Sequence, residues 1–377
     1  MHHSANWRAC LLLLFCLFPA ASLHALSILT YNVGGNGATN WSTNSVQVQA
    51  IGRQMQYLQP DVITFNEVPF SHSSQMTNFV PAYLPGYFLA MNSGTDGAIR
   101  SAIISRYPIV RSVKWLDGVS LVPFGYTNTN PTFTRDLFEA EINVPGFSNH
   151  LHVFTTHLKA LADSQSAARR AAEASAISNF FVTTFLPING QRPYLLTGDL
   201  NEDVSRPPSS SQHPIERLVN AATGLRLTTP RNPVTSDERT WSIRNSSLTV
   251  RFDYVLPGGL LFSNMASSQV FRSDRLSPMP PNLFTNDSRT ASDHLPVLVV
   301  FHNPYDTRFG FTAIALSNQL VRLNWQTTTG RQYRVEGSPD FISWSSLSTN
   351  LTATSSNLSW TLSRSGNQQF LRVYRLP

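Results

Sequence analysis

The feature of this chain that most restricts its fold is a series of short apolar runs spread over the first 302 residues. Several of these runs are apolar at successive positions rather than at alternate ones, which is typical of strands covered on both faces of a sheet. The sequence therefore predicts sheets buried between other layers. The runs are 26–33, 61–68, 101–107, 136–144, 151–158, 194–201, 251–256 and 295–301.

Helical patterns lie between these runs. Residues 45–58 repeat apolar side chains at helical spacing up to Pro60, and residues 164–185 are rich in alanine. Residues 214–222 begin at Pro214, which is favourable in the first turn of a helix. Strands that alternate with helices predict an α/β domain over residues 26–302, with helices outside a sheet core.

The pattern changes after residue 302. Residues 309–377 alternate apolar and polar side chains as strands do, with turns rich in Ser, Thr and Asn. They predict a small all-β sandwich module, joined by a linker at 303–308, with Trp325, Tyr333 and Trp344 in its core. We expect this accessory module to attach the protein to a surface or polymer.

The N-terminal segment 1–25 reads as a secretory signal peptide. Arg8 precedes an apolar run that is too short to span a membrane, and small residues follow it. We therefore expect an extracellular or periplasmic protein. Both cysteines, Cys10 and Cys16, lie in this segment, so the mature chain would carry neither a disulfide nor a thiol. No later stretch is long and apolar enough to cross a membrane.

The charge is mildly basic. Charged residues make up only 13% of the chain, about half the usual share of roughly 25%, while the net charge is +6 with a pI near 9.5. This balance suits nucleic acid, an anionic lipid or a small phosphate ester equally well, and no Lys/Arg run marks a polybasic tail. Charge alone does not choose a substrate.

Polar side chains with catalytic capacity stand at the ends of the predicted strands. A stable sheet does not need carboxylates at one edge, and several of them together repel unless a cation lies among them. A hard divalent cation such as Mg²⁺ prefers oxygen ligands of this kind, whereas the lack of cysteine disfavours a zinc cage. These residues are Asn32, Glu67, His157, Asp199, Asn201, Asp253, Asp293 and His294.

An ordered series of motifs resembles the endonuclease/exonuclease/phosphatase superfamily, whose fold is that of deoxyribonuclease I. The resemblance covers residues 26–302 and departs from the family where Asn66 replaces the usual Gln before the metal-binding Glu. It implies a four-layered α/β sandwich of two packed β-sheets flanked by helices, here followed by the small β-sandwich. The motifs are TYNV (30–33), DVITFNE (61–67), SAIISRYPI (101–109), TTHLKA (155–160), LLTGDLN (195–201), RFDYVL (251–256) and SDHLPV (292–297).

The resemblance implies a metal site and a phosphate site. Glu67 would be the direct Mg²⁺ ligand, with Mn²⁺ as an alternative metal, and Asn32 and Asp293 would be further ligands, directly or through water. Arg135 would bind a phosphate group of the substrate bidentately.

The resemblance also implies roles for the remaining residues. Asp199 would orient or deprotonate the attacking water, and the Asn201 amide would hold the water or a phosphoryl oxygen. His294 would donate to the non-bridging phosphate oxygens, with Asp253 fixing its tautomer. His157 would protonate the leaving oxygen.

We therefore expect a secreted, Mg²⁺-dependent phosphoesterase that hydrolyses phosphodiester bonds by in-line attack of water, with nuclease-like activity on DNA or RNA. One alternative is a sphingomyelinase-like lipid phosphodiesterase, in which residues 120–126 would enter the bilayer. Another is an inositol-phosphate phosphatase. The non-enzyme alternative is an inactive extracellular binding or adhesion protein that has kept the fold.

Overall fold

The computed structural model describes eight segments of the chain. The predicted signal segment up to residue 24 and residues 306–310, which include the second half of the predicted linker, lie outside them. The described residues are 25–205, 213–245, 247–305, 311–315, 320–327, 329–340, 343–363 and 370–376.

The first sheet has six strands, and only its β1–β2 pair is parallel. All four runs predicted for this sheet form strands. Its two edge strands, β3 and β10, were not predicted from the sequence. In spatial order the strands are β10 (Met265–Val270), β11 (Val297–Phe301), β1 (Leu26–Asn32), β2 (Val62–Pro69), β4 (Ile99–Ser105) and β3 (Phe88–Met91).

The second sheet has five strands, and only its β7–β8 pair is parallel. The other four predicted runs form strands here, and the missed strand β5 again lies at an edge. The spatial order is β5 (Ile109–Trp115), β6 (Leu137–Ile142), β7 (Leu151–His157), β8 (Tyr194–Asp199) and β9 (Asp253–Pro257).

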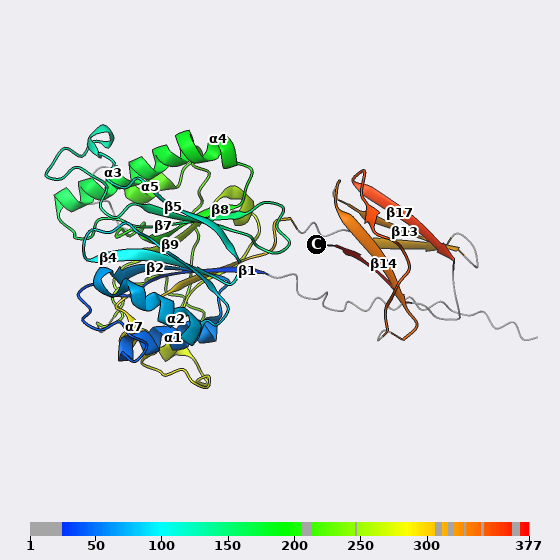
Figure 1. The fold of residues 1–377 in the computed structure, drawn as a ribbon, viewed down its shortest axis with the longest axis horizontal. Helices are drawn as coiled ribbons and strands as arrows, with labels where there is room; N and C mark the ends of the chain where they lie inside the picture. The colour runs from blue at the N-terminus through cyan, green and yellow to red at the C-terminus, as the bar shows by residue number, and fades with distance from the viewer. Residues whose placement is uncertain are drawn as a thin grey trace, which may run out of the picture.

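Helices cover the outer face of each sheet, which completes four layers (Figure 1). α1 (Val46–Leu58), α2 (Met76–Tyr83) and α7 (Asp287–Ala291) pack on the first sheet. α3 (Ser164–Phe180), its π-helical continuation η3 (Phe181–Phe185), α4 (Leu186–Asn189) and α5 (Pro214–Leu218) pack on the second. Shorter elements are η1 (Phe70–Gln75), η2 (Val122–Phe124), α6 (Gly259–Phe262) and η4 (Ser273–Arg275). None of the helices in the described segments is long and apolar enough to cross a membrane.

The core between the sheets explains why the strand runs are apolar on both faces. Side chains such as Ile28, Val153 and Val299 lie in one buried cluster between the sheets, while Leu29 and Phe154 pack outward against helices. Burial of each such side chain contributes about 1.5–3 kcal/mol to stability. The predicted four-layered sandwich is confirmed.

Local signals set the helix ends. The Ser45 hydroxyl accepts a bond from Val48 N at the start of α1, and Asp163 caps α3 in the same way. The predicted helix 214–222 is shorter in the structure and ends at Leu218. Its C-terminal half is replaced by a turn in which the Asn220 amide bonds neighbouring backbone groups.

The C-terminal strands form two small sheets around a core of their own. β12 (Phe311–Ala315), β13 (Leu320–Gln326) and β17 (Asn357–Ser363) make one, and β14 (Gln332–Ser338) pairs with β15 (Ser345–Ser346), β16 (Leu351–Thr352) and β18 (Phe370–Arg375) in the other. Trp325 and Tyr333 are buried in this core, as the sequence predicts. The prediction for Trp344 is wrong, because its indole is only half-buried and lies under the Arg372 guanidinium, whose carbon is 4.2 Å from the ring centre. The domain limits and the attachment role stay predictions.

Strand direction brings the polar strand ends to one edge. The parallel pairs β1–β2 and β7–β8 deliver their C-terminal residues there. β9 and β11 run the other way, so their N-terminal ends arrive at the same edge, with Asp253 beginning β9 and His294 preceding β11. The site is therefore built from both kinds of strand end.

Candidate active site

Asp199 is the residue that connects the other members of the site. It is the last residue of β8, where it stands beside His157 of β7 and Asp253 of β9. Its Oδ2 accepts a bond from Asn32 Nδ2 at 2.9 Å and lies 3.4 Å from His157 Nε2 and 3.7 Å from His294 Nε2. A buried carboxylate thus meets an amide and two imidazoles drawn from both sheets.

Gly198 allows Asp199 to occupy this position. Its φ of +136° is a conformation that side chains rarely adopt, and a Cβ there would lie 1.9 Å from the Thr156 carbonyl oxygen of the neighbouring strand. Only glycine permits this close approach of β7 and β8. The glycine of the GDxN motif is therefore a packing requirement for the acid that follows it.

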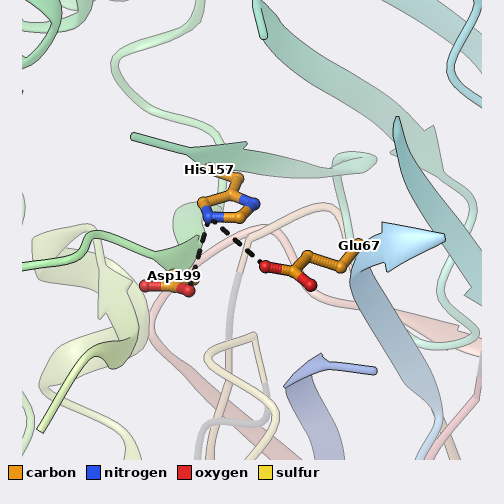
Figure 2. A group of neighbouring side chains, drawn as sticks. All are labelled: Glu67, His157 and Asp199. Carbon is orange, nitrogen blue, oxygen red and sulfur yellow. Dashed lines mark ion pairs between the residues drawn. The ribbon is translucent and has the colours of Figure 1, made fainter. Parts of the chain in front are cut away.

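An irregularity in β2 sets the direction of the Glu67 side chain. The pairing of β2 with β4 shifts register between Phe65 and Val68, and Glu67 has a left-handed φ of +59°. Bulges of this kind redirect a side chain, and such backbone strain is concentrated at functional sites. The Glu67 carboxylate lies toward His157, with Oε1 4.0 Å from Nε2 (Figure 2).

His294 is held by a short bond to Asp253. His294 Nδ1 lies 2.8 Å from Asp253 Oδ2, and both side chains are buried. Burial lowers the pKa of His294, but the carboxylates of Asp253, Asp199 and Asp293 outweigh it and raise the pKa to about 10. The ring is therefore a cation at neutral pH.

Burial shifts the pKa values of Asp199 and His157 in the directions that favour their uncharged forms. Burial, with the Asp253 carboxylate, raises the pKa of Asp199 to about 7 against the opposing effect of His294 and Asn32. Burial also holds the pKa of His157 well below its ordinary value, and the cations Arg135, His294 and Lys159 add to this. Metal-free, the site therefore contains one charged and one neutral histidine.

Asp293 has two neighbours that set its orientation. Trp241 Nε1 donates to Asp293 Oδ2 at 3.0 Å, and the half-buried indole also packs against Phe252. The Ser292 hydroxyl donates to the Asn32 carbonyl at 2.7 Å and accepts from His294 N at 3.1 Å, which ties β1 to the start of β11. No local pattern in the sequence indicates Trp241, because this residue reaches the site only through tertiary packing.

Asn66, where the chain departs from the family pattern, is a buried bridge between the sheets. Its amide donates to Ser101 Oγ at 3.0 Å and to Thr155 Oγ1 at 3.3 Å. Its Oδ1 accepts from the Asp199 backbone N at 3.1 Å. The shorter side chain therefore still supports the backbone of the residue that organises the site.

Asn201 and Arg135 lie beside the cluster. Asn201, with a left-handed φ of +50°, donates its backbone N to Asp199 Oδ1 and its amide to the Leu158 carbonyl. Arg135 Nε bonds Asp96 at 2.8 Å, and its Nη1 bonds the carbonyls of His157 and Leu158. These contacts hold the end of β7 in place, so the predicted phosphate contact would have to come from the remaining nitrogen of Arg135.

The structure brings most of the predicted residues into one contact network. Asn32, Glu67, His157, Asp199, Asn201, Asp253 and His294 are connected by the distances given above. Asp293 joins through its neighbour His294 and through Gly34, which lies close to its carboxylate. Arg135 touches the network through the backbone carbonyls of His157 and Leu158, the second of which also accepts from Asn201.

The donor set fits a divalent cation. The carboxylates of Glu67, Asp199 and Asp253 converge there with two imidazoles, and both Asp253 Oδ1 and the His157 ring lack hydrogen-bond partners among the described residues. Carboxylate and amide oxygens are the ligands that hard divalent cations prefer. Of the predicted metal ligands, Asn32 Oδ1 accepts from Gly34 N at 2.9 Å and keeps its second lone pair.

The two-sheet sandwich with an acidic and histidine-bearing edge agrees with a family whose members are generally metal-dependent phosphoester hydrolases. The sequence model of the Endonuclease/Exonuclease/phosphatase family matches residues 29–294, so the chain belongs to this family. No curated protein matches the chain by sequence.

Solved structures share the fold at low sequence identity. A family protein from Leptotrichia buccalis is 18% identical with a TM-score of 0.51, covering 74% of this chain and 99% of its own. A family protein from Bacteroides thetaiotaomicron is 18% identical with a TM-score of 0.51, covering 74% and 95%. Beta toxin from Staphylococcus aureus is 17% identical with a TM-score of 0.50, covering 73% and 99%.

Proposed function

We propose that the protein is a secreted, Mg²⁺-dependent phosphodiesterase that cleaves nucleic acid by in-line attack of water on phosphorus. The observation that carries this proposal is the position of Asp199. Its buried carboxylate meets the Asn32 amide, neutral His157 and cationic His294 at one sheet edge. A protein that only needed the fold would gain nothing from burying an acid there, because burial of a charged group is unfavourable.

Glu67, Asn32 and Asp293 would hold the metal, with Mn²⁺ as the alternative to Mg²⁺. When bound, such a cation polarises the phosphoryl group and neutralises the charge that develops on it. Glu67 is suited to this because its side chain is partly accessible, at 19%. The oxygen-rich character of these three residues supports the choice of a hard cation.

Asp199 would orient the attacking water and accept its proton. One of its oxygens is already held by Asn201 N and the other by Asn32 Nδ2, so the carboxylate direction is set before substrate binds. The metal cation would lower the pKa of this carboxyl from about 7 toward the anion that the reaction needs. Asn201 would position the water or a phosphoryl oxygen.

His294 would donate to the phosphate as an imidazolium, and Asp253 would keep it charged. A charged donor stabilises the negative charge that grows on the non-bridging oxygens. His157 is neutral, so its contribution would be a hydrogen bond to the leaving oxygen rather than the delivery of a stored proton. This changes the role predicted from the sequence for His157.

The preference for nucleic acid rests on the resemblance to the family of deoxyribonuclease I together with the basic balance of the chain. The net charge of +6 is compatible with a polyanion that extends beyond the site, since each phosphate neutralised releases bound counterions. Residues 120–126, the segment considered for membrane entry, are not an exposed apolar hairpin. Leu121 and Tyr126 are buried, and the exposed apolar side chains are Val122, at 47%, and Pro123.

A lipid phosphodiester is the second candidate, because two exposed apolar side chains follow site residues along the chain. Phe70 is 41% exposed in η1 just after Glu67, and Leu161 is 66% exposed in the loop after His157. Side chains of this kind at the rim of a site would enter the interfacial region of a bilayer. Arg100 stacks over Phe70, with its guanidinium carbon 4.6 Å from the ring centre.

The test is hydrolysis of a panel with Mg²⁺ and with EDTA. The panel contains plasmid DNA, single-stranded DNA, RNA, sphingomyelin vesicles and inositol phosphates. We expect cleavage of nucleic acid with Mg²⁺ and none with EDTA. Cleavage of vesicles alone, reduced by Phe70→Ser and Leu161→Ser, would select the lipid candidate, and cleavage of inositol phosphates alone would select a phosphatase. A folded protein that cleaves no member of the panel would support the binding-protein alternative.

A further inference from the structure

Three donor atoms in the site form a possible metal-ligand set that shares Glu67 with the predicted set of Glu67, Asn32 and Asp293. It differs from that set because it includes a histidine nitrogen. Glu67 Oε1, His157 Nε2 and Asp199 Oδ2 lie within 4.8 Å of one another (Figure 2). They come from the ends of β2, β7 and β8, so each is anchored on a strand of the core. A ligand set on such elements is held more rigidly than one on loops.

The His157 ring is buried without a hydrogen-bond partner. Its exposure is 2%, and within the described segments neither Nδ1 nor Nε2 is bonded. The other buried histidines of the described segments differ, because His152 bonds Glu139, His213 bonds Ile215 N and His294 bonds Asp253. Leaving a buried polar group unpaired is unfavourable, so a ligand for this ring is expected.

The distances fit a shared cation. A metal about 2.0–2.2 Å from each nitrogen or oxygen donor places neighbouring donors roughly 3.0–3.5 Å apart. His157 Nε2 and Asp199 Oδ2 are 3.4 Å apart already. Glu67 Oε1 is 4.0 Å from Nε2, and the partly exposed Glu67 side chain can rotate to close that gap.

A second group of possible metal ligands, Asp199, Asp253 and His294, also lies close together, but its histidine is not free to bind a cation. His294 Nδ1 is committed to Asp253 at 2.8 Å, and its Nε2 faces Asn32 Nδ2 at 3.5 Å. The Nδ1 bond to Asp253 and the amide group facing Nε2 leave no room for a cation at this ring. His157 is therefore the histidine of the site that is free to ligate.

We propose that Glu67, His157 and Asp199 form a binding site for a borderline divalent cation of the Zn²⁺ and Co²⁺ type. One imidazole with two carboxylates suits such metals, whereas Mg²⁺ takes oxygen ligands and keeps its waters. Three protein ligands leave a position open for water or an anion. If the proposed function holds, a cation here occupies Asp199 and inhibits the Mg²⁺-supported reaction.

The experiment measures metal binding on the full chain. Metal-free protein is titrated with Co²⁺ and followed by visible absorption. His157→Asn should weaken Co²⁺ binding by at least about tenfold, since loss of even an outer partner of a ligand typically costs 10–100-fold. The control is His150→Asn, a half-exposed histidine that bonds Glu141 outside the site. His2 and His3 are present in both variants, so their contribution cancels.

A second measurement does not depend on a variant. X-ray absorption of the wild-type chain with one equivalent of Zn²⁺ should show the outer-shell scattering that an imidazole ligand produces. Absence of imidazole scattering, or Co²⁺ binding unchanged in folded His157→Asn, overturns the proposal. Failure of the hydrolysis panel would remove the inhibitory role but leave this binding result intact.

Discussion

His294 Nδ1 and Asp253 Oδ2 lie 2.8 Å apart at the end of the two sheets, with both side chains buried. The pair makes a buried histidine cationic, because the nearby carboxylates overcome the effect of burial and raise the pKa of His294 to about 10. Removing one partner of such a pair leaves the other poorly compensated.

Asp253→Asn should therefore lower the pKa of His294, since burial remains while the largest opposing charge is lost. We expect the rate at pH 8 to fall about 10²- to 10⁴-fold, because wild-type His294 is charged below its folded pKa and the variant loses that charge at lower pH. The alkaline limb of the kcat/KM profile should move to lower pH. Asp274→Asn, at an accessible pair with Arg272, is the control. An unmoved alkaline limb would contradict the assignment.

Asp199→Asn should abolish hydrolysis while preserving the fold. The amide keeps an oxygen to accept a backbone or side-chain bond but cannot take a proton from water, so we expect a loss of about 10³-fold or more. Circular dichroism checks that the variant is folded. Residual cleavage within a factor of two of wild type would remove Asp199 from the reaction.

Asp136→Asn should make stability less dependent on pH. Burial raises the pKa of Asp136 to about 7, with Asp117 adding to the shift, and its Oδ2 has no partner among the described residues. The folded pKa lies above the unfolded value of 3.8, so wild-type stability is lost as pH rises from about 4 to about 7.

Asp136→Asn does not lose stability in this way as pH rises, because its amide does not ionise. Between pH 4.5 and pH 8, the free energy of unfolding of Asp136→Asn relative to wild type should increase by about 2–4 kcal/mol. Urea unfolding at the two pH values measures it. An equal difference between the two proteins at both pH values would show that the Asp136 carboxyl is not perturbed.

Gly198→Ala should destabilise the protein by about 3 kcal/mol or more, because the new Cβ would meet the Thr156 carbonyl and the φ is unfavourable for alanine. Gly259→Ala is the matched control, since a Cβ there meets nothing within 4 Å, and a change within about 0.5 kcal/mol is expected. Thermal unfolding of both variants compares them. Equal melting temperatures would refute the packing argument for the GDxN glycine.

Much of the fold could be predicted from local patterns. Eight apolar runs correspond to strands of the two sheets, and the helices at 45–58 and 164–185 are present. The missed strands β3, β5 and β10 are at or near sheet edges, where one face or margin is exposed and the apolar signal is weaker. The small sheets after residue 310 follow from alternation in the same way.

The candidate site was predictable as a set of residue types but not as a set of contacts. Asn32, Glu67, Asp199 and His294 could be selected because each stands at a strand end. Trp241 could not, because nothing local indicates that its indole will reach Asp293. Nor does the sequence show that His157 will be neutral and unbonded while His294 is charged.

The sequence by itself determined which segments become strands and which polar side chains stand at their ends, because apolar periodicity is a local property. Only the tertiary structure decided how these ends meet. Asn32 and Asp199 are 167 positions apart and hydrogen-bonded, and the bulge at Glu67 directs its carboxylate toward His157. Such distances, and the pKa shifts that depend on them, arise from packing two sheets face to face, since burial and neighbouring charge are properties of the assembled layers.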